Sequence, residues 1–241
     1  MLGLGIGGLG LLASGLALLA GGRRGLGYGQ LGGAAFLLAS TASFLHTTLH
    51  GKFVVWERIL GELGLRGDEH ILDLGCGRGA VLLMAARRLR SGRVVGVDLW
   101  RGVDQSANSP SITWANAEAE GVTGRVELHT ADMRALPFAD ARFDVVLSSL
   151  AVHNIRGDAD RARAISEAVR VLRPGGRLVI VDIRHVATYQ QWLAQHGLTD
   201  LQRRRLGWRY WYGGPWVEAE LLTGTRPGPD RGGGEARTRG G

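Results

Sequence analysis

The sequence contains little cysteine and little lysine. Cys76 is the only cysteine among the 241 residues, which excludes an internal disulfide and any zinc or iron–sulfur site built from several cysteines. A single thiol is more typical of a reducing compartment than of disulfide-rich secreted proteins. Lys52 is the only lysine, so arginine supplies almost all of the 29 basic residues. These shortages exclude sites but assign no function.

Acidic residues are missing from the first 50 positions, where Arg23 and Arg24 carry the only formal charges. The ends of the chain therefore supply part of the net charge of +7. Once the two basic residues of 1–50, and the four basic and two acidic residues of 226–241, are set aside, 23 basic and 20 acidic residues remain. The middle is nearly balanced, so we expect no nucleic-acid partner. The run Arg203–Arg205 is more typical of a solvated face or a lipid-headgroup contact.

The first 50 residues are instead rich in apolar side chains. Residues 2–20 consist almost entirely of Leu, Gly, Ala and Ile. As a helix they would span about 28 Å, close to the hydrocarbon thickness of a bilayer. A second apolar stretch runs from about 31 to 49, with the turn expected at 21–30. The pattern predicts an apolar helical hairpin over 1–50 and a membrane location. An apolar helix that lies at the interface or joins copies of the chain is the alternative.

The charges near the hairpin give mixed signals about its orientation. A spanning hairpin would place Arg23 and Arg24 on the side opposite the rest of the chain, against the positive-inside tendency. Lys52 and Arg58, after the second apolar stretch, favour a cytoplasmic location for the remainder. We predict that residues 51–225 face the cytoplasm.

Residues 51–225 alternate helix-like and strand-like patterns. Helices are expected at 53–63, 80–89, 110–119, 159–172 and 188–196. Strands are expected at 70–74, 93–97, 126–130, 143–149 and 177–182, with two aromatic-rich strands near 200–212 and 216–224. Such alternation predicts one α/β domain with a doubly wound, mostly parallel sheet. Residues 226–241, mostly Gly, Arg and Pro, predict a disordered tail.

A glycine-rich turn follows the first predicted strand of this domain. Gly75, Gly77 and Ala80 satisfy the pattern G-x-G-x-x-G/A, which lets a ligand approach the N-terminus of the next helix. The same spacing also occurs in tight turns that bind nothing.

Three aspartates strengthen the case for a ligand. Asp73 ends the first strand, Asp98 ends the second and Asp132 follows the third. The carboxyl ends of parallel strands meet at one edge of a sheet, where open α/β folds bind ligands. Asp73 lies in an apolar strand, where a carboxylate is costly without a partner. Together the three predict a ligand with a cationic part and several hydrogen-bond donors.

The sequence resembles the class I S-adenosylmethionine (SAM)-dependent methyltransferases, over about residues 53–224. The resembling segments are 72–79, Asp98, 131–138, 143–146 and 171–178. They are most similar to the ubiquinone/menaquinone-type, small-molecule branch. The resemblance implies a Rossmann-like seven-stranded sheet with an antiparallel last strand, and SAM as cofactor.

The resemblance also implies a cofactor-binding set. It consists of Asp73, Gly75, Cys76, Gly77, Gly79, Asp98, Leu99, Trp100, Asp132, Met133 and Ser148. The glycines would accept the methionine portion and Asp73 would support the loop or the amino group. Asp98 would bind the ribose and Asp132 the adenine amino group. Cys76 is expected to serve by its small size, and Trp100 by contact with the nucleoside or by simple packing.

The loop after the fourth predicted strand holds the candidate catalytic residues. His153 could take a proton from a methyl acceptor, since imidazole titrates near neutral pH, and Asn154 adjoins it. The alternative is that both side chains only hydrogen-bond the backbone of their loop.

Evidence for the acceptor is sparse. The polar loop 104–108 could line its pocket, and the aromatic residues between Trp208 and Trp216 could stack on it, lie at a membrane interface or pack in the sheet. An apolar hairpin beside a methyltransferase suggests a small-molecule or lipid-like acceptor at the membrane. An NAD-dependent oxidoreductase and a non-catalytic cofactor-binding membrane protein are the alternatives.

Overall fold

The computed structural model describes residues 2–102 and 108–228, and the chain divides into two compact units. The first unit comprises residues 1–64 and 204–221, and the second comprises 65–203 and 222–241. The predicted hairpin segment 1–50 is therefore part of a larger unit, which also takes in the next helix and a segment close to the end of the domain. The two units are described in turn.

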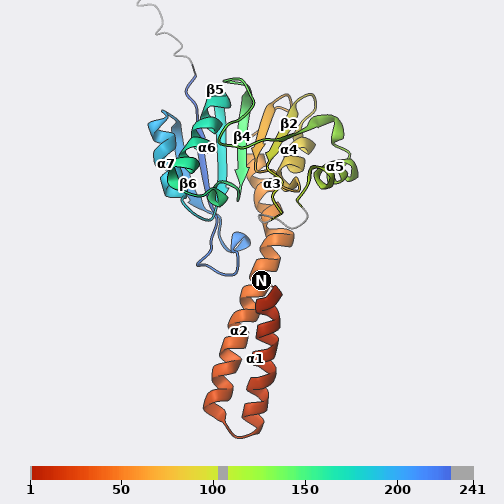
Figure 1. The fold of residues 1–241 in the computed structure, drawn as a ribbon, viewed down its shortest axis with the longest axis vertical. Coiled ribbons are helices and arrows are strands. Elements are labelled where there is room, and N and C mark those ends of the chain that lie inside the picture. Colours follow the sequence, from red (N-terminus) through yellow and green to blue (C-terminus); the bar gives the residue numbers. More distant parts are fainter. Residues whose placement is uncertain (1, 103–107, 229–241) are drawn as a thin grey trace, which may run out of the picture. The chain divides into compact units, whose positions relative to one another are not determined.

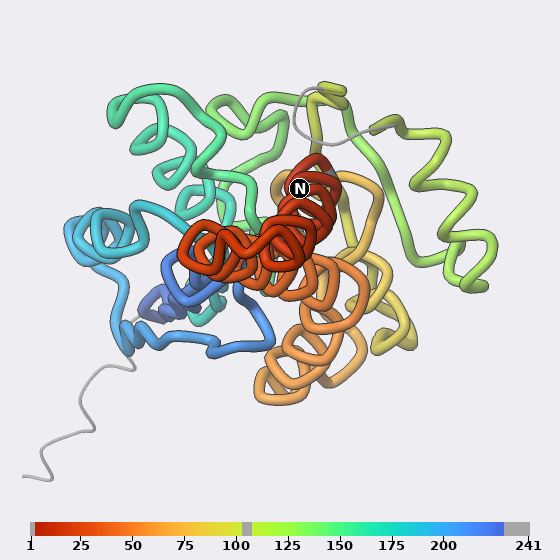
Figure 2. Tube along the Cα trace, turned by 90° about the horizontal axis from the view of Figure 1, so that it is seen from below, coloured from red at the N-terminus to blue at the C-terminus, as the bar shows by residue number. Residues whose placement is uncertain are grey.

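A helical hairpin makes up much of the first unit, as predicted. Helices α1 (Leu2–Ala20) and α2 (Arg24–His46) run side by side (Figures 1 and 2). The turn between them is shorter than the predicted 21–30, because the Gly27 amide already donates to the Arg23 carbonyl at 3.0 Å. A side chain at Gly27 would lie 2.7 Å from Leu19, so the small residues here let the helices approach closely.

Only one of the two predicted apolar segments has the length and composition of a membrane span. Among the described residues that segment is Gly3–Ala20 of α1. Glycine, serine and threonine dilute the apolar content of α2. The surface of the hairpin is nevertheless apolar on several sides, with Ile6, Leu9, Leu26 and Phe36 each more than half exposed.

A π-helical turn joins the hairpin to the next helix without a break. It is η1 (Thr47–Gly51), and α3 (Lys52–Glu62) follows it directly. Helix α3 is amphipathic and buries one apolar face, on which Trp56 is 1% exposed. The prediction of a helix at 53–63 is confirmed to within one residue.

Both predicted C-terminal strands are present, but the prediction that they carry the aromatic residues is wrong. The last strands are β6 (Thr199–Arg205) and β7 (Glu220–Thr225), and the aromatic residues lie between them in residues 206–219, here called the aromatic segment. This segment contains a short 3₁₀ helix, η4 (Trp208–Tyr210), and bends at Gly213 and Gly214, whose φ angles are 102° and 150°. Glycine adopts such positive φ angles readily, and they interrupt the extended backbone that aromatic side chains favour.

The aromatic segment packs on the hairpin and π-turn of its own unit. The Trp211 carbonyl accepts hydrogen bonds from the hydroxyls of Ser43 (3.1 Å) and Thr47 (2.7 Å). The Tyr210 hydroxyl accepts one from the Trp56 indole at 3.1 Å. A side chain at Gly51 would collide with the Arg209 carbonyl, so the absence of one permits the contact.

A seven-stranded sheet organises the second unit, with the order β3-β2-β1-β4-β5-β7-β6. Its first five strands are parallel neighbours: β1 (His70–Leu74), β2 (Arg93–Asp98), β3 (Val126–Thr130), β4 (Phe143–Ser149) and β5 (Leu172–Asp182). Gly175 donates to the Arg226 carbonyl and Arg226 to the Gly176 carbonyl, so the start of β5 lies against the end of β7. Strand β7 is therefore antiparallel, which confirms the expected Rossmann-like α/β sheet.

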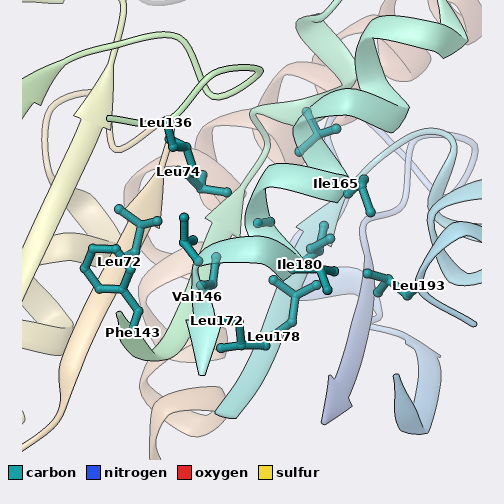
Figure 3. Close-up of a cluster of buried hydrophobic side chains, with 14 of the residues drawn as sticks. Leu72, Leu74, Leu136, Phe143, Val146, Ile165, Leu172, Leu178, Ile180 and Leu193 are labelled. Atoms are coloured by element: carbon teal, nitrogen blue, oxygen red, sulfur yellow. The ribbon is translucent and has the colours of Figure 1, made fainter. Parts of the chain in front are cut away.

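Helices alternate with these strands. They are α4 (Ala80–Arg88), α5 (Pro110–Ala119), α6 (Asp158–Val171) and α7 (Val186–Gln195), with 3₁₀ turns η2 (Thr123–Arg125) and η3 (Val152–Asn154). The chain order reverses between β1 and β4, and right-handed crossovers place α4 and α5 on the opposite face from α6 and α7. The core cluster of Figure 3 includes Leu72, Val146 and Ile180 from the strands and Ile165 and Leu193 from α6 and α7.

The folded chain continues past the predicted start of the tail at 226. The Arg226 guanidinium donates to the carbonyls of Val169, Arg170 and Leu172, at 3.0, 3.2 and 2.5 Å, at the end of α6. Arg226 is thus part of the domain, while residues 229–241 of the predicted tail lie outside the described residues.

Candidate active site

The glycine turn after β1 is built for close approach. Gly75 has φ +72°, and a Cβ there would lie 2.3 Å from the Ala151 methyl and 3.4 Å from the end of Met133. Only glycine fits both the backbone and the space. The turn is fixed from beneath, because the Gly75 and Cys76 amides donate to the Val97 carbonyl of β2 at 2.8 and 3.1 Å.

The remaining turn residues lead into α4. Gly79 is the residue before that helix, so free backbone amides of its first turn face the carboxyl edge of the sheet. The Thr113 hydroxyl of α5 donates to the Gly77 carbonyl at 2.7 Å and steadies the turn from the side. Cys76 is buried against Gly96. Burial raises the pKa of its thiol well above the usual value, and the nearby Asp73 and Asp98 carboxylates raise it further. The thiol therefore stays protonated, in keeping with a role in packing.

Asp73 is the most unusual group of the site. Its side chain is 1% exposed, and neither carboxylate oxygen makes a hydrogen bond of ordinary geometry with any described residue. Burial, reinforced by the Asp98 carboxylate and only partly offset by the nearby Leu82 amide, raises the pKa of Asp73 to about 7. A buried carboxylate without a partner is costly, and a bound cation or N–H donor would relieve the cost.

Asp98 lies at the end of β2 and is held by three donors. Its Oδ2 accepts from the Gly77 amide at 2.9 Å, and its Oδ1 accepts from the Trp100 amide at 2.7 Å and the Asn108 side chain at 3.1 Å. The same carboxylate thus joins the glycine turn to the loop after β2. Trp100 adopts φ +55°, and its indole donates to the Thr130 hydroxyl at 2.8 Å. Leu99 is exposed beside it.

Asp132, after β3, is the acid with the firmest intramolecular partner. Arg134 donates to its two oxygens at 2.6 to 3.0 Å and also reaches Asp160 at 2.5 Å. The Arg134 hydrogen bonds hold the pKa of Asp132 below its usual value. The carboxylate is ionised and keeps little spare acceptor capacity. Met133, next in sequence, reaches toward Gly75.

Strand β4 supplies the opposite wall. Ser148 is buried, and its hydroxyl donates to the Leu74 carbonyl at 3.2 Å, which ties β4 to β1. Leu150 adopts φ +56°, an uncommon conformation for a leucine, and Ala151 then contacts the glycine turn. Strain of this kind gathers at functional sites.

His153 lies in η3, just beyond that strained loop, and faces an acid that the sequence reading missed. Its Nδ1 lies 2.5 Å from Oδ1 of Asp182, and its backbone amide donates to Oδ2 at 3.1 Å. Asp182 is fully buried at the end of β5, and its Oδ1 also accepts from the Ile183 amide at 2.8 Å. The His153 side chain is 15% exposed, so the imidazole borders solvent while its acid partner is buried.

The signal for Asp182 was present in the sequence. It is an aspartate directly after a buried apolar strand, the same pattern that singled out Asp73 and Asp98. Asn154 shows the simpler of its two expected roles: its side chain is exposed and donates to the Leu150 carbonyl at 3.4 Å.

Parallel pairing gathers the predicted residues at one edge of the sheet. Leu74 pairs with Val97 on one side and with Ser148 on the other, and Asp98 pairs with Thr130. Of the predicted acceptor loop 104–108, residues 104–107 lie outside the described residues, and Asn108 binds Asp98. In the described parts of the chain, no group of three or more His, Cys, Asp and Glu side chains is arranged to hold a metal ion.

The sequence is similar to known proteins over this same region. Residues 72–180 match the family model described as a methyltransferase domain. A 27-O-demethylrifamycin SV methyltransferase of Amycolatopsis mediterranei is 36% identical over 128 residues, which cover 52% of this chain and 43% of that protein. A demethylmenaquinone methyltransferase of Thermus thermophilus is 36% identical over 133 residues, covering 55% and 56%. The chain thus spans about half the length of the curated relatives it matches.

Solved structures share the fold at lower identity. A geranyl diphosphate methyltransferase in complex with SAM has a TM-score of 0.58 at 19% identity, covering 72% of this chain and 85% of that one. The [4+2]-cyclase SpnF has the same TM-score at 21% identity, covering 72% and 81%. Since one neighbour is titled a cyclase, the fold by itself does not specify the reaction.

Proposed function

We propose that the chain, whose residues 72–180 match the methyltransferase-domain family model, transfers a methyl group from SAM to a small apolar acceptor held near a membrane. SAM is the cofactor of the domain. The acceptor class and the membrane setting are the parts of the proposal that need experiment.

The buried, unpartnered carboxylate of Asp73 is the observation that carries the proposal. Together with Asp98 it places two carboxylates around a turn that only glycine can form. A cofactor with a cationic amino group and ribose hydroxyls supplies the donor that Asp73 lacks and can add to those that Asp98 already has. Asp73 would receive the amino group or hold the turn that does so, and Asp98 would bind the ribose. Asp132, already ionised, would offer its remaining capacity to the adenine amino group.

When bound, SAM supplies an electrophilic methyl group on a positively charged sulfur. The chain's own task is to orient the acceptor and to exclude water, because alignment lowers the barrier of such a transfer without a covalent enzyme intermediate. His153 would take the proton that an O–H, N–H or C–H acceptor loses. Asp182, whose Oδ1 lies 2.5 Å from Nδ1 and whose Oδ2 accepts from the His153 backbone amide, would hold the ring in place for that step.

Three features support an apolar acceptor at a membrane. The hairpin exposes Leu and Ile side chains on several sides, α1 is long enough to cross a bilayer, and residues 2–50 contain no acid. Relatives that carry menaquinone-type names also use acceptors of that class. We infer that the hairpin holds the enzyme at a bilayer in which the acceptor dissolves.

Calorimetry on the full chain in lipid nanodiscs tests the cofactor site. SAM should bind with micromolar or better affinity, and NAD should not bind. Asp98→Ala should weaken SAM binding by about 2 kcal/mol or more, as expected when a charged hydrogen-bond acceptor is removed. The matched control is Asp140→Ala, an exposed acid that pairs with Arg170. NAD binding in place of SAM would favour the oxidoreductase alternative.

A methyl-transfer assay tests the acceptor. The full chain in nanodiscs is incubated with radiolabelled SAM and one of three acceptor sets: demethylated quinones, lipid headgroups or water-soluble phenols. Transfer to the apolar set alone is the expected result. Equal rates on the soluble set would contradict the membrane setting, and SAM binding without transfer to any set would favour a non-catalytic protein.

A further inference from the structure

The aromatic segment (206–219) is the feature that the methyltransferase reaction leaves unused. Its large side chains fall into two groups. Tyr210 is fully buried, and Tyr212 packs edge-on against Phe44 of α2 at 5.9 Å between ring centroids. Trp208 and Trp216, by contrast, are 53% and 60% exposed. The first group attaches the segment to the hairpin, and the second presents two indoles to the surroundings.

The two exposed tryptophans lie against helix α2 at different positions along its axis. Trp216 stacks on Phe36 at 5.3 Å between centroids, and Trp208 stacks on His46 at 5.0 Å. Phe36 and His46 are ten residues apart in α2, so the two levels differ by about 15 Å along the helix. His46 is the level nearer to the π-turn, and Phe36 is nearer to the Arg23 end.

The segment also has the charge and backbone of an interfacial element. The segment contains one base and one acid: the Arg209 guanidinium covers the Trp208 ring at 4.6 Å, and Glu218 accepts from the Gly207 amide at 2.8 Å. At the tip around Trp216, the Tyr212 amide donates to Val217 and the Val217 amide to Gly214, while Pro215 has no N–H. The amides of Gly213, Gly214 and Trp216 donate to no described residue, so they need the water or headgroup acceptors that the membrane interface supplies and the hydrocarbon layer does not.

We propose that the aromatic segment is a membrane-interface element that fixes how deeply the hairpin inserts, with Trp216 deeper in the bilayer than Trp208. This rests on the membrane anchoring in the proposed function. From Arg24, α2 rises about 18 Å to Phe36 and about 33 Å to His46, values on either side of the roughly 30 Å hydrocarbon layer. If the Arg23–Arg24 turn reaches the far boundary, the near boundary falls between the two tryptophans. Arg209 and Lys52 then lie on the headgroup side, where basic residues favour anionic lipid.

The test measures depth directly on the full chain. The protein is labelled with 5-fluorotryptophan, placed in nanodiscs of phosphatidylcholine and phosphatidylglycerol, and studied by ¹⁹F NMR. Trp208→Phe and Trp216→Phe each remove one of seven signals and so assign it. Phenylalanine keeps an aromatic ring at each stacked position. A lipid with a nitroxide on its acyl chain and a gadolinium chelate in the water are the two depth probes.

The expected result is opposite ordering with the two probes. The acyl-chain nitroxide should broaden Trp216 severalfold more than Trp208, and the gadolinium chelate should broaden Trp208 more than Trp216. The same sample after reduction of the nitroxide with ascorbate gives the reference line widths.

Equal broadening, or response to gadolinium alone, would overturn the proposal even while the chain floats with vesicles. A chain that fails to float with vesicles of the same lipids would instead refute the anchoring itself. Calorimetric SAM binding separates both outcomes from failure of the cofactor site.

Discussion

Helices α1 and α6 are both rich in small and aliphatic residues, yet they are composed for different surroundings. Helix α6 buries Ile165, Ala168 and Val169 on one face, carries aspartates in its first turn and exposes Arg163. Helix α1 has no charged residue, and Ile6, Leu9 and Leu16 are each more than half exposed. The contrast shows that apolar content alone does not make a core helix. The arrangement of the polar residues distinguishes a helix that packs one face on a sheet from one that exposes apolar side chains along its length.

Matched charge substitutions should separate the two helices most strongly. Ile165→Asp places a carboxylate in the core and should cost about 4 kcal/mol or more of stability, read as loss of the cooperative thermal transition. Leu9→Asp in α1 should weaken vesicle binding by about 3 kcal/mol and leave SAM affinity unchanged. Arg163→Gln on the exposed side of α6 is the neutral control. Unfolding by Leu9→Asp would show that α1 also serves as a core helix.

The histidine–aspartate pair of the second unit should affect turnover and spare binding. His153→Ala is expected to lower kcat by about 10²- to 10⁴-fold for an acceptor that must lose a proton. Asp182→Asn should lower it less, because the amide keeps the shape of the side chain beside His153 and still accepts from its backbone amide. Calorimetric SAM affinity is the control readout. Unchanged kcat in both variants would return His153 to a purely structural role.

The buried Asp73 gives a pH dependence of known sign. Because burial raises the pKa of Asp73 to about 7, the carboxylate is protonated below that pH and cannot receive a cation. SAM affinity should therefore fall about tenfold from pH 8 to pH 6. The ligand-free chain should behave in the opposite way: the folded state binds more protons than the unfolded state between about pH 4 and 7, so stability rises as pH falls through this range. Asp73→Asn should remove both effects, and a pH dependence that survives it would assign them to another group.

The smallest expected effect lies at the contact between the hairpin and the aromatic segment. Gly51→Ala pushes a methyl group against the Arg209 carbonyl and should cost about 1 to 3 kcal/mol, measured by urea unfolding. Gly32→Ala, in the same run of helix with open space around it, should instead stabilise by about 0.5 kcal/mol. Equal effects of the two would mean that the aromatic segment does not press on the π-turn.

The strand edge carrying Asp73, Asp98 and Asp132 could be predicted because each acid follows a short buried run, and parallel strands bring such ends together. The pairing of His153 with Asp182 could not, since it joins loops after two different strands and depends on rotamers. The aromatic residues between Trp208 and Trp216 misled the prediction for a related reason. Their intrinsic preference for strands was outweighed by packing on α2, a partner some 170 positions earlier that no local pattern reveals.

The π-turn at Thr47–Gly51 has a consequence for how length changes would be tolerated. A π-helical turn accommodates one residue more than an α-helical turn, so it rotates everything after it by about 100° relative to a regular helix. That rotation sets which side of α3 carries Trp56, the residue that meets Tyr210. Removing a single residue from 47–51 and restoring a regular helix would therefore keep Trp56 in phase with Tyr210, whereas a regular helix with all five residues would turn Trp56 away. The number of residues in 47–51 and their π-helical hydrogen bonding therefore decide together which face of α3 meets Tyr210.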